Sequence, residues 1–141
     1  MTKEFKQINN VFPAGEYYIG DFCYLLDDED YYEIVCSFLY DGEPYQYKKY
    51  NFLFGSTAYG DGQYSDNKGN SCYSVDSGTI GIINLPTKKL KEQAKELLRC
   101  RCANVVKFDK SFTVYYGHGV FYFGDILINT DYSEDEDYED D

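Results

Sequence analysis

The chain has 141 residues, of which 43% are hydrophobic and 27% charged, and its formal net charge is -12. This length suits a single domain with a real core, and no apolar run reaches the roughly 18 residues that a membrane-spanning helix needs. Seventeen Tyr and ten Phe with no Trp favour strands, because aromatic side chains fit a pleated, half-buried surface. The first residues lack the apolar stretch of a signal peptide, so we expect a cytoplasmic protein.

The negative charge is concentrated at the C-terminus, where eight of the 25 acidic residues lie between residues 131 and 141. The other 17 acids against 13 bases leave residues 1–130 with a net charge of only -4. Blocks of like charge repel one another and stay solvated. We therefore predict a lead-in over residues 1–12, one globular domain over residues 13–131 and an acidic disordered tail over residues 132–141.

The segment from residue 13 to residue 26 carries aromatic and aliphatic residues interrupted by Gly20-Asp21, a pattern that predicts two strands or one strand bent at a bulge. A helix follows, with Asp27 or Asp28 as its N-cap and acidic residues in its first turn. Residues spaced i, i+3, i+4, i+7 and i+8 form its apolar stripe: Tyr31, Ile34, Val35, Phe38 and Leu39. Gly42 is expected to end it.

The middle of the chain alternates strand and turn signals. We predict a strand over residues 50–58, a break at Gly60-Asp61-Gly62 and a short strand that ends at Ser65. Residues 66–70 have the composition of a turn, in which Gly and Asn tolerate positive φ. A strand pair over residues 72–84 is then interrupted at Asp76-Ser77-Gly78.

A second amphipathic helix is predicted over residues 86–100, with Thr87 or Asn84 as its cap. Its apolar stripe consists of Leu90, Ala94, Leu97 and Leu98. Six of the 13 bases lie on or just after it: Lys88, Lys89, Lys91, Lys95, Arg99 and Arg101. We interpret them as the solvated face of the helix, because the acidic tail would repel phosphates, and nucleic acid is therefore not an expected partner.

The remaining segment, up to Thr130, predicts three or four short strands joined at Asp109-Lys110, Gly117-His118-Gly119 and Gly124-Asp125. Short strands with tight turns indicate a compact antiparallel sheet. The predicted fold is therefore α+β: a single domain with a twisted antiparallel sheet, or a partly open β-barrel, and two amphipathic helices.

Four aspartates lie next to or near glycines at the predicted strand ends: Asp21, Asp61, Asp76 and Asp125. Their simplest role is structural, because an Asp side chain accepts hydrogen bonds from nearby backbone N–H groups and Gly supplies the positive φ of a turn. If the four converge, they form a ligand-binding site together with Tyr59 and Tyr64. In that case Asp21, Asp61 and Asp76 would supply the oxygen ligands that Ca²⁺ or Mg²⁺ prefers. We favour the turn role, which requires no cofactor.

The sequence gives little support for disulfides, a zinc site or a catalytic motif. The five cysteines are an odd number without a signal peptide, which predicts reduced thiols. Cys100, Cys102 and His118 give zinc three ligands where a structural site needs four. His118 lies between two glycines in a predicted turn, and none of the common hydrolase, metalloprotease or phosphate-binding motifs occurs. An enzymatic function is therefore the less favoured interpretation.

Three segments of the chain resemble, in order and spacing, the motifs of a protein family: "PAGEYYIGDFCYLLDDEDYYE", "FGSTAYGDGQYSDNKGNSCYSVDSGTIGII" and "GVFYFGDILINTD". This is an uncharacterised family of small proteins encoded by phages, large DNA viruses and some bacteria. Its motifs read A-G-x-Y-x-I-G-D-P-C-Y, G-T-A-Y-G-D-G-x-Y and Y-x-V-D-[SA]-G-x-I-G. The similarity covers roughly residues 13–131. The chain departs from it at Phe22, where Pro is usual, and at Tyr31 or Tyr32, where Trp is common.

The resemblance implies a shared fold and a viral origin, and it carries no established activity. We expect a non-enzymatic binding protein, a viral accessory protein that acts on a protein partner in the host cytoplasm. Surface tyrosines suit this role because they offer a large contact area at low entropic cost. The alternative is a small enzyme or a domain that binds a ligand or divalent cation through the Gly-flanked aspartates.

Overall fold

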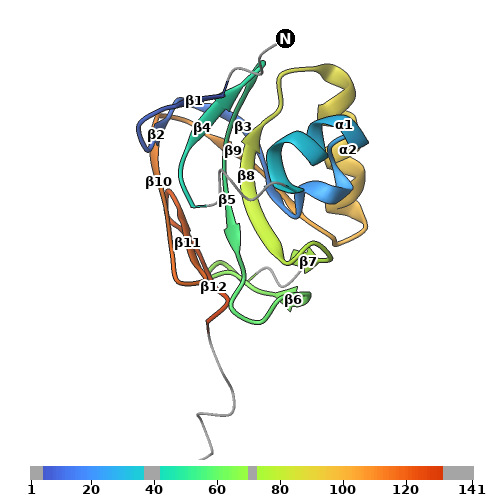
Figure 1. The fold of residues 1–141 in the computed structure, drawn as a ribbon, viewed down its shortest axis with the longest axis vertical. Coiled ribbons are helices and arrows are strands. Elements are labelled where there is room, and N and C mark those ends of the chain that lie inside the picture. Colours follow the sequence, from blue (N-terminus) through green and yellow to red (C-terminus); the bar gives the residue numbers. More distant parts are fainter. Residues whose placement is uncertain (1–4, 37–41, 70–72, 132–141) are drawn as a thin grey trace, which may run out of the picture.

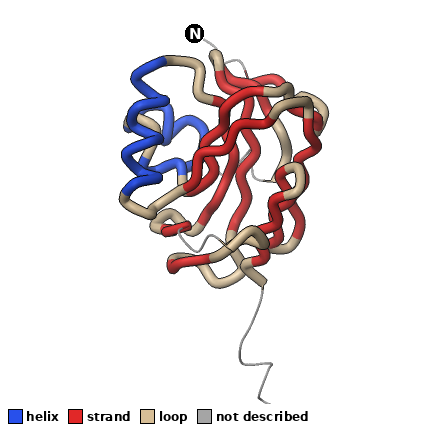
Figure 2. The backbone as a smooth tube through the Cα atoms, turned by 180° about the vertical axis from the view of Figure 1, so that it is seen from behind, coloured by secondary structure: helices blue, strands red, loops and turns tan. Residues whose placement is uncertain are grey.

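A computed structural model of the protein describes residues 5–36, 42–69 and 73–131. These residues form three layers: a layer of helices, a six-stranded sheet and a four-stranded sheet (Figure 1). The helices lie together on one side of the six-stranded sheet, and the four-stranded sheet lies on its other side (Figure 2). The predicted α+β fold with antiparallel sheets and two helices is confirmed, and the sheets do not close into a barrel.

Every strand pair in the sheets is antiparallel. The six-stranded sheet has the order β1 (Phe5–Gln7), β4 (Tyr45–Tyr47), β5 (Tyr50–Ser56), β8 (Thr79–Asn84), β3 (Gly15–Gly20) and β9 (Asn104–Phe108). The four-stranded sheet has the order β12 (Ile126–Asn129), β11 (Val120–Phe123), β10 (Phe112–Gly117) and β2 (Val11–Phe12). A separate hairpin pairs β6 (Gly62–Tyr64) with β7 (Tyr73–Val75).

The central strands of the six-stranded sheet are buried on both faces, which explains why their sequences read as continuous apolar runs. In β3, Tyr17 and Ile19 point into the core between the two sheets, whereas Tyr18 points into the core beneath the helices. In β5, Leu53 faces the inter-sheet core, and Phe52 faces the helices. The period of two along each strand thus builds two hydrophobic cores from one sheet.

The prediction of a strand or bulge immediately after Gly20-Asp21 is wrong. Residues Phe22–Tyr24 form a short 3₁₀ helix, η1, because Asp21 caps it by accepting a hydrogen bond from the Cys23 N–H at 2.9 Å. The apolar residues that suggested a strand serve the helix-side core instead: Phe22 is 1% exposed and contacts the rings of Phe52 and Phe54.

The first predicted helix begins where the sequence indicates. Asp27 is its N-cap and accepts a hydrogen bond from the Asp30 N–H at 2.8 Å. The α-helical part, α1, is only Asp28–Tyr31, and a π-helical turn, η2, continues it over Tyr32–Cys36. Ile34 and Val35 are buried as predicted. The rest of the predicted stripe, Phe38 and Leu39, lies outside the described residues.

The second predicted helix is confirmed as α2, Lys88–Arg99, and Thr87 is its N-cap. The other candidate cap, Asn84, instead fastens the β4–β5 turn: it accepts from the Asn51 N–H at 2.8 Å and donates to the Lys49 carbonyl at 3.0 Å. Ala94 is buried against the sheet. Leu98 is exposed, because it lies at the margin of the apolar stripe.

The remaining boundaries agree closely with the sequence at the C-terminal end and less closely at the N-terminal end. The strands β9 to β12 are separated by turns at the three predicted positions. Residues 5–12, expected as a lead-in, instead supply β1 and β2, because Phe5 stacks on Tyr47 and Phe12 is fully buried. The predicted tail, residues 132–141, lies outside the described residues. Within the described part of the chain, the helices are too short and too polar to cross a membrane.

Gly81 provides a test of the packing beneath the helices. A Cβ at this position would lie 2.6 Å from Phe22, 2.7 Å from Phe54 and 2.7 Å from the Leu53 carbonyl oxygen. We expect Gly81→Ala to destabilise the protein by about 2–3 kcal/mol, measured by chemical denaturation, because a packed core resists an added methyl group.

Gly117→Ala is the matched control on β10. Its Cβ would meet only the hydroxyl end of Tyr115, an exposed side chain that can move, so a loss below about 1 kcal/mol is expected. Equal losses in the two variants would contradict the packing described for Gly81.

Candidate functional site

Asp21 lies at the end of β3 and is completely buried. Its Oδ1 accepts hydrogen bonds from the Cys23 N–H at 2.9 Å and the Ser77 hydroxyl at 2.8 Å. Its Oδ2 accepts from the N–H groups of Asp76 and Ser77, both at 2.7 Å. Four donors therefore surround one carboxylate, and they take up the usual capacity of its two oxygens.

Three of the four donors come from the turn between β7 and β8, which the sequence marks as Asp76-Ser77-Gly78, and the fourth is the Cys23 N–H of η1. Gly78 has a φ of +80°, a backbone conformation that favours glycine, and this shape turns two successive N–H groups toward Asp21. The Ser77 hydroxyl also lies 2.7 Å from the Thr79 hydroxyl, which is buried. Asp21 thus caps its own 3₁₀ helix and a turn from a distant part of the chain.

Two other predicted site residues lie near this turn, but both are exposed. A Cβ on Gly78 would be 4.0 Å from Asp61 Oδ1, so Asp61 borders the turn that contains Asp76. Burial raises the pKa of the Cys23 thiol well above its usual value, and the charges of Asp21, Asp76 and Asp61 raise it further. The structure therefore brings three of the four aspartates to one end of the molecule.

This arrangement is poorly suited to cation binding or nucleophilic catalysis. The oxygens of Asp21 point at amides and a hydroxyl of the protein, so they are not available as ligands. No group of three or more His, Cys, Asp or Glu side chains is placed to hold a metal ion within residues 5–36, 42–69 and 73–131. A thiol with a raised pKa stays protonated at neutral pH, so Cys23 is a poor nucleophile. His118 is exposed in the β10–β11 turn, with a φ of +52°.

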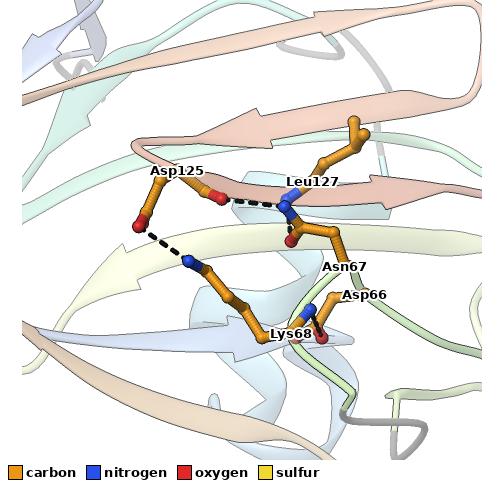
Figure 3. Close-up of polar contacts among 5 residues, drawn as sticks. All are labelled: Asp66, Asn67, Lys68, Asp125 and Leu127. Carbon is orange, nitrogen blue, oxygen red and sulfur yellow. Dashed lines mark hydrogen bonds and ion pairs between the residues drawn. The ribbon is translucent and has the colours of Figure 1, made fainter.

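The fourth aspartate, Asp125, belongs to a different contact (Figure 3). Its exposed carboxylate pairs with Lys68 Nζ at 2.8 Å, and this hydrogen bond and charge lower the pKa of Asp125. Asn67, next to Lys68, bonds the edge of β12: its N–H donates to the Leu127 carbonyl, and its Oδ1 accepts from the Leu127 N–H. Asp125 therefore does not join the other three aspartates.

The two tyrosines predicted for this site, Tyr59 and Tyr64, differ in their surroundings. Tyr59 is 58% exposed in the turn after β5. Tyr64, at the end of β6, donates a hydrogen bond to the Gly60 carbonyl at 2.8 Å and so closes the loop that contains Asp61. It also lines a hollow of about 460 Å³ between β6 and β12, together with Gln63, Asn67 and Asn129.

A second surface, on the four-stranded sheet, was not predicted from the sequence. Exposed side chains of the four-stranded sheet, on the face away from the core, form what we call the outer face: Val11, Thr113, Tyr115, Tyr122 and the half-buried Leu127. Tyr115 and Tyr122 are cross-strand partners with ring centroids 5.7 Å apart, and they are 56% and 43% exposed. The sequence signal for it is the alternation in "FTVYYG" and "VFYF", whose buried members Phe112, Val114, Phe121 and Phe123 leave Tyr115 and Tyr122 outside.

The outer face is uncharged in a strongly acidic protein. None of the residues in β2, β10, β11 and β12 is charged, whereas 27% of the residues in the whole chain are.

Comparisons of the chain with protein-family models, with curated proteins and with solved structures give no match.

Asp21→Asn tests the buried carboxylate. The variant would turn an amide NH₂ toward N–H and hydroxyl donors, and such a mismatch costs about 3 kcal/mol of stability, measured by thermal or chemical unfolding. Asp76→Asn is the control, because the exposed Asp76 side chain contributes no contact to this network. Its expected effect is within about 0.5 kcal/mol, and a comparable loss there would contradict the role assigned to Asp21.

A second test addresses cations. Because Asp21 is saturated by protein donors, we expect calorimetric titration with Ca²⁺, Mg²⁺ or Mn²⁺ to show no binding tighter than about 1 mM, the weak end of natural calcium sites. Saturable heat that disappears in an Asp61→Asn variant would show instead that the aspartates coordinate a cation.

Proposed function

We propose that the protein is a non-enzymatic interaction module that binds a protein partner through the outer face. The observation that carries this proposal is the exposed Tyr115–Tyr122 pair on a sheet whose strands contain no charged residue. Tyrosine is enriched at the centres of interfaces, where charged residues are depleted. A face that is aromatic and uncharged therefore has the composition of an interface core.

The backbone beneath these tyrosines supports the same function. Gly117 lies two residues after Tyr115 on β10, and a Cβ there would be 2.9 Å from the Tyr115 hydroxyl oxygen. The ring of Tyr115 therefore lies along the strand over a glycine, which leaves room for it against the sheet. A tyrosine offers a large contact area at low cost in conformational entropy, because only two side-chain torsions are fixed when a partner covers it.

The remaining chemistry supports binding more than catalysis. The Asp21 oxygens are occupied by protein donors, burial keeps the Cys23 thiol protonated, and His118 is exposed in a turn. The more specific role, that of a viral accessory protein that acts in the host cytoplasm, rests on the motif resemblance alone.

Paired tyrosine variants test the proposal. The wild-type chain and a Tyr115→Ala/Tyr122→Ala variant are used as bait in host-cell lysate, and the captured proteins are quantified by mass spectrometry. We expect the double variant to lose a specific partner about tenfold or more, because truncation of central interface tyrosines removes much of the binding energy.

The control is Tyr32→Ala/Tyr59→Ala, which removes two tyrosines that are 66% and 58% exposed but lie on other surfaces. It should retain the partner, as should a chain that ends at Asp131. An equal loss in both double variants, or no specific partner for the wild-type chain, would contradict the proposed role of the outer face.

A further inference from the structure

β12 is the edge strand of the four-stranded sheet, and a short turn of the same chain covers part of its edge. Asp66 forms an isolated antiparallel bridge with Ile128. Asn67 then makes three hydrogen bonds: from its N–H to the Leu127 carbonyl at 3.0 Å, from the Leu127 N–H to its Oδ1 at 2.8 Å, and from its Nδ2 to the Asp125 carbonyl at 3.1 Å. We call residues 67 and 68 the edge cover, and Asp66 is its attachment point.

The Asn67 side chain takes the place of a peptide group of a neighbouring strand. A paired strand would donate an N–H to the Leu127 carbonyl and offer a carbonyl oxygen to the Leu127 N–H. Asn67 supplies the first from its main chain and the second from its side-chain amide, and so it satisfies the edge without extending the sheet. Uncovered, the same two groups would be open to an extended chain.

The edge cover is held mainly by contacts that water can replace. Asn67 and Lys68 are exposed, and the Asp125 side chain that pairs with Lys68 is 77% exposed. Exposed ion pairs contribute little to stability. The firm attachment is at Asp66, whose Oδ2 accepts a hydrogen bond at 2.6 Å from the buried Tyr73. Departure of Asn67 and Lys68 breaks the hydrogen bond from the Lys68 N–H to Asp66 Oδ1 at 2.8 Å and opens the Asp66–Ile128 bridge, while the Asp66 side chain stays on Tyr73.

We propose that residues 67 and 68 are a displaceable cover, and that the edge of β12 at Leu127 binds an extended peptide with basic residues. Such strand addition is a common mode of peptide recognition, in which main-chain hydrogen bonds provide the affinity. The chemistry of the ligand follows from the cover itself: a peptide N–H and carbonyl for Leu127, and a cation for Asp125. Asp66, opposite Ile128, and Asp131, after the C-terminal end of β12, add negative charge along the same strand.

The space beside the edge is large enough for a short strand. A strand occupies about 160 Å³ per residue, taking about 4.8 Å between strands, 3.3 Å along the strand and 10 Å across the sheet. The hollow of about 460 Å³ between β6 and β12 therefore accommodates about three residues. Its walls include Gln63, Asn129 and Thr130.

A second copy of the chain is the less suitable occupant. Two paired β12 edges would bring together two molecules that each carry a net charge of -12. Like charges at close range oppose such pairing, whereas a basic peptide gains from the same field.

The experiment compares three synthetic pentapeptides with the full-length protein by calorimetry and by NMR hydrogen exchange. The first, Lys-Val-Thr-Val-Lys, is basic and extended. The second has Glu in place of both Lys, and the third has Pro in place of the central Thr, which removes a main-chain donor at unchanged charge. Each is titrated into the wild-type protein, Asn67→Ala and the control Asn10→Ala, an exposed Asn beside β2.

In Asn67→Ala we expect faster exchange of the Leu127 amide, and binding of the basic peptide about tenfold tighter than in the wild type, a factor equal to roughly 1.4 kcal/mol. The bound peptide should restore protection of that amide. The acidic and proline peptides should bind weakly, and Asn10→Ala should match the wild type. Lys68→Gln, which weakens the cover without changing Asn67, should give a smaller gain and guards against a folding defect in Asn67→Ala.

Unchanged peptide affinity in both cover variants, or equal affinity for the proline peptide, would overturn the proposal. A dimer of Asn67→Ala that the basic peptide does not dissociate, detected by analytical ultracentrifugation, would also overturn it, because a second copy would then be the occupant. The proposal does not depend on Tyr115 or Tyr122, so its failure would leave the function proposed for the outer face standing.

Discussion

The buried carboxylate of Asp21 joins two parts of the chain that lie more than 50 residues apart in sequence. A buried charge is costly unless hydrogen bonds satisfy it, so Asp21 requires the β7–β8 turn in its observed shape. The shape of this turn also depends on Asp21, because two N–H groups of the turn and the Ser77 hydroxyl point at the Asp21 carboxylate. The helical layer is linked to the same group: burial raises the pKa of Tyr31 in α1, and a hydrogen bond with Ser77 lowers it in part. The end of the molecule where three predicted site residues gather is therefore a structural joint.

Much of the fold was predictable because local chemistry and tertiary structure agree there. The turns at Asp109-Lys110, Gly117-His118-Gly119 and Gly124-Asp125 separate real strands, and Thr87 caps a real helix. The prediction failed at Phe22, where an apolar run reads equally well as a strand or as a buried helical turn. The side chain of Asp21 decided the outcome by capping that turn, and its main partner comes from residues 76–77. A contact between such distant segments depends on strand order, which a single sequence does not display.

The candidate site was also predictable in part: the positions of its residues along the chain were, and their partners were not. Gly-flanked aspartates were correctly located at the ends of strands, but their partners were not predictable from spacing. Asp21 is buried, Asp61 and Asp76 are exposed beside it, and Asp125 pairs with Lys68 in another part of the molecule. The tyrosines of the outer face carried a readable signal, since Tyr115 and Tyr122 alternate with buried residues on adjacent strands. What the sequence lacked was the register that places the two rings side by side.

The four-stranded sheet offers two kinds of surface that differ in chemistry. Its outer face is aromatic and uncharged, so contacts there depend on buried area and shape and are insensitive to salt. The edge of β12 presents main-chain groups next to Asp66, Asp125 and Asp131, so contacts there depend on backbone geometry and charge and weaken as salt increases. Leu127 belongs to both, because its side chain lies on the outer face beside Tyr122 and its main chain forms the edge. A strand added at Leu127 would widen the sheet that carries the tyrosines. Salt dependence of binding therefore separates the contribution of the edge from that of the face, even for a partner that uses both.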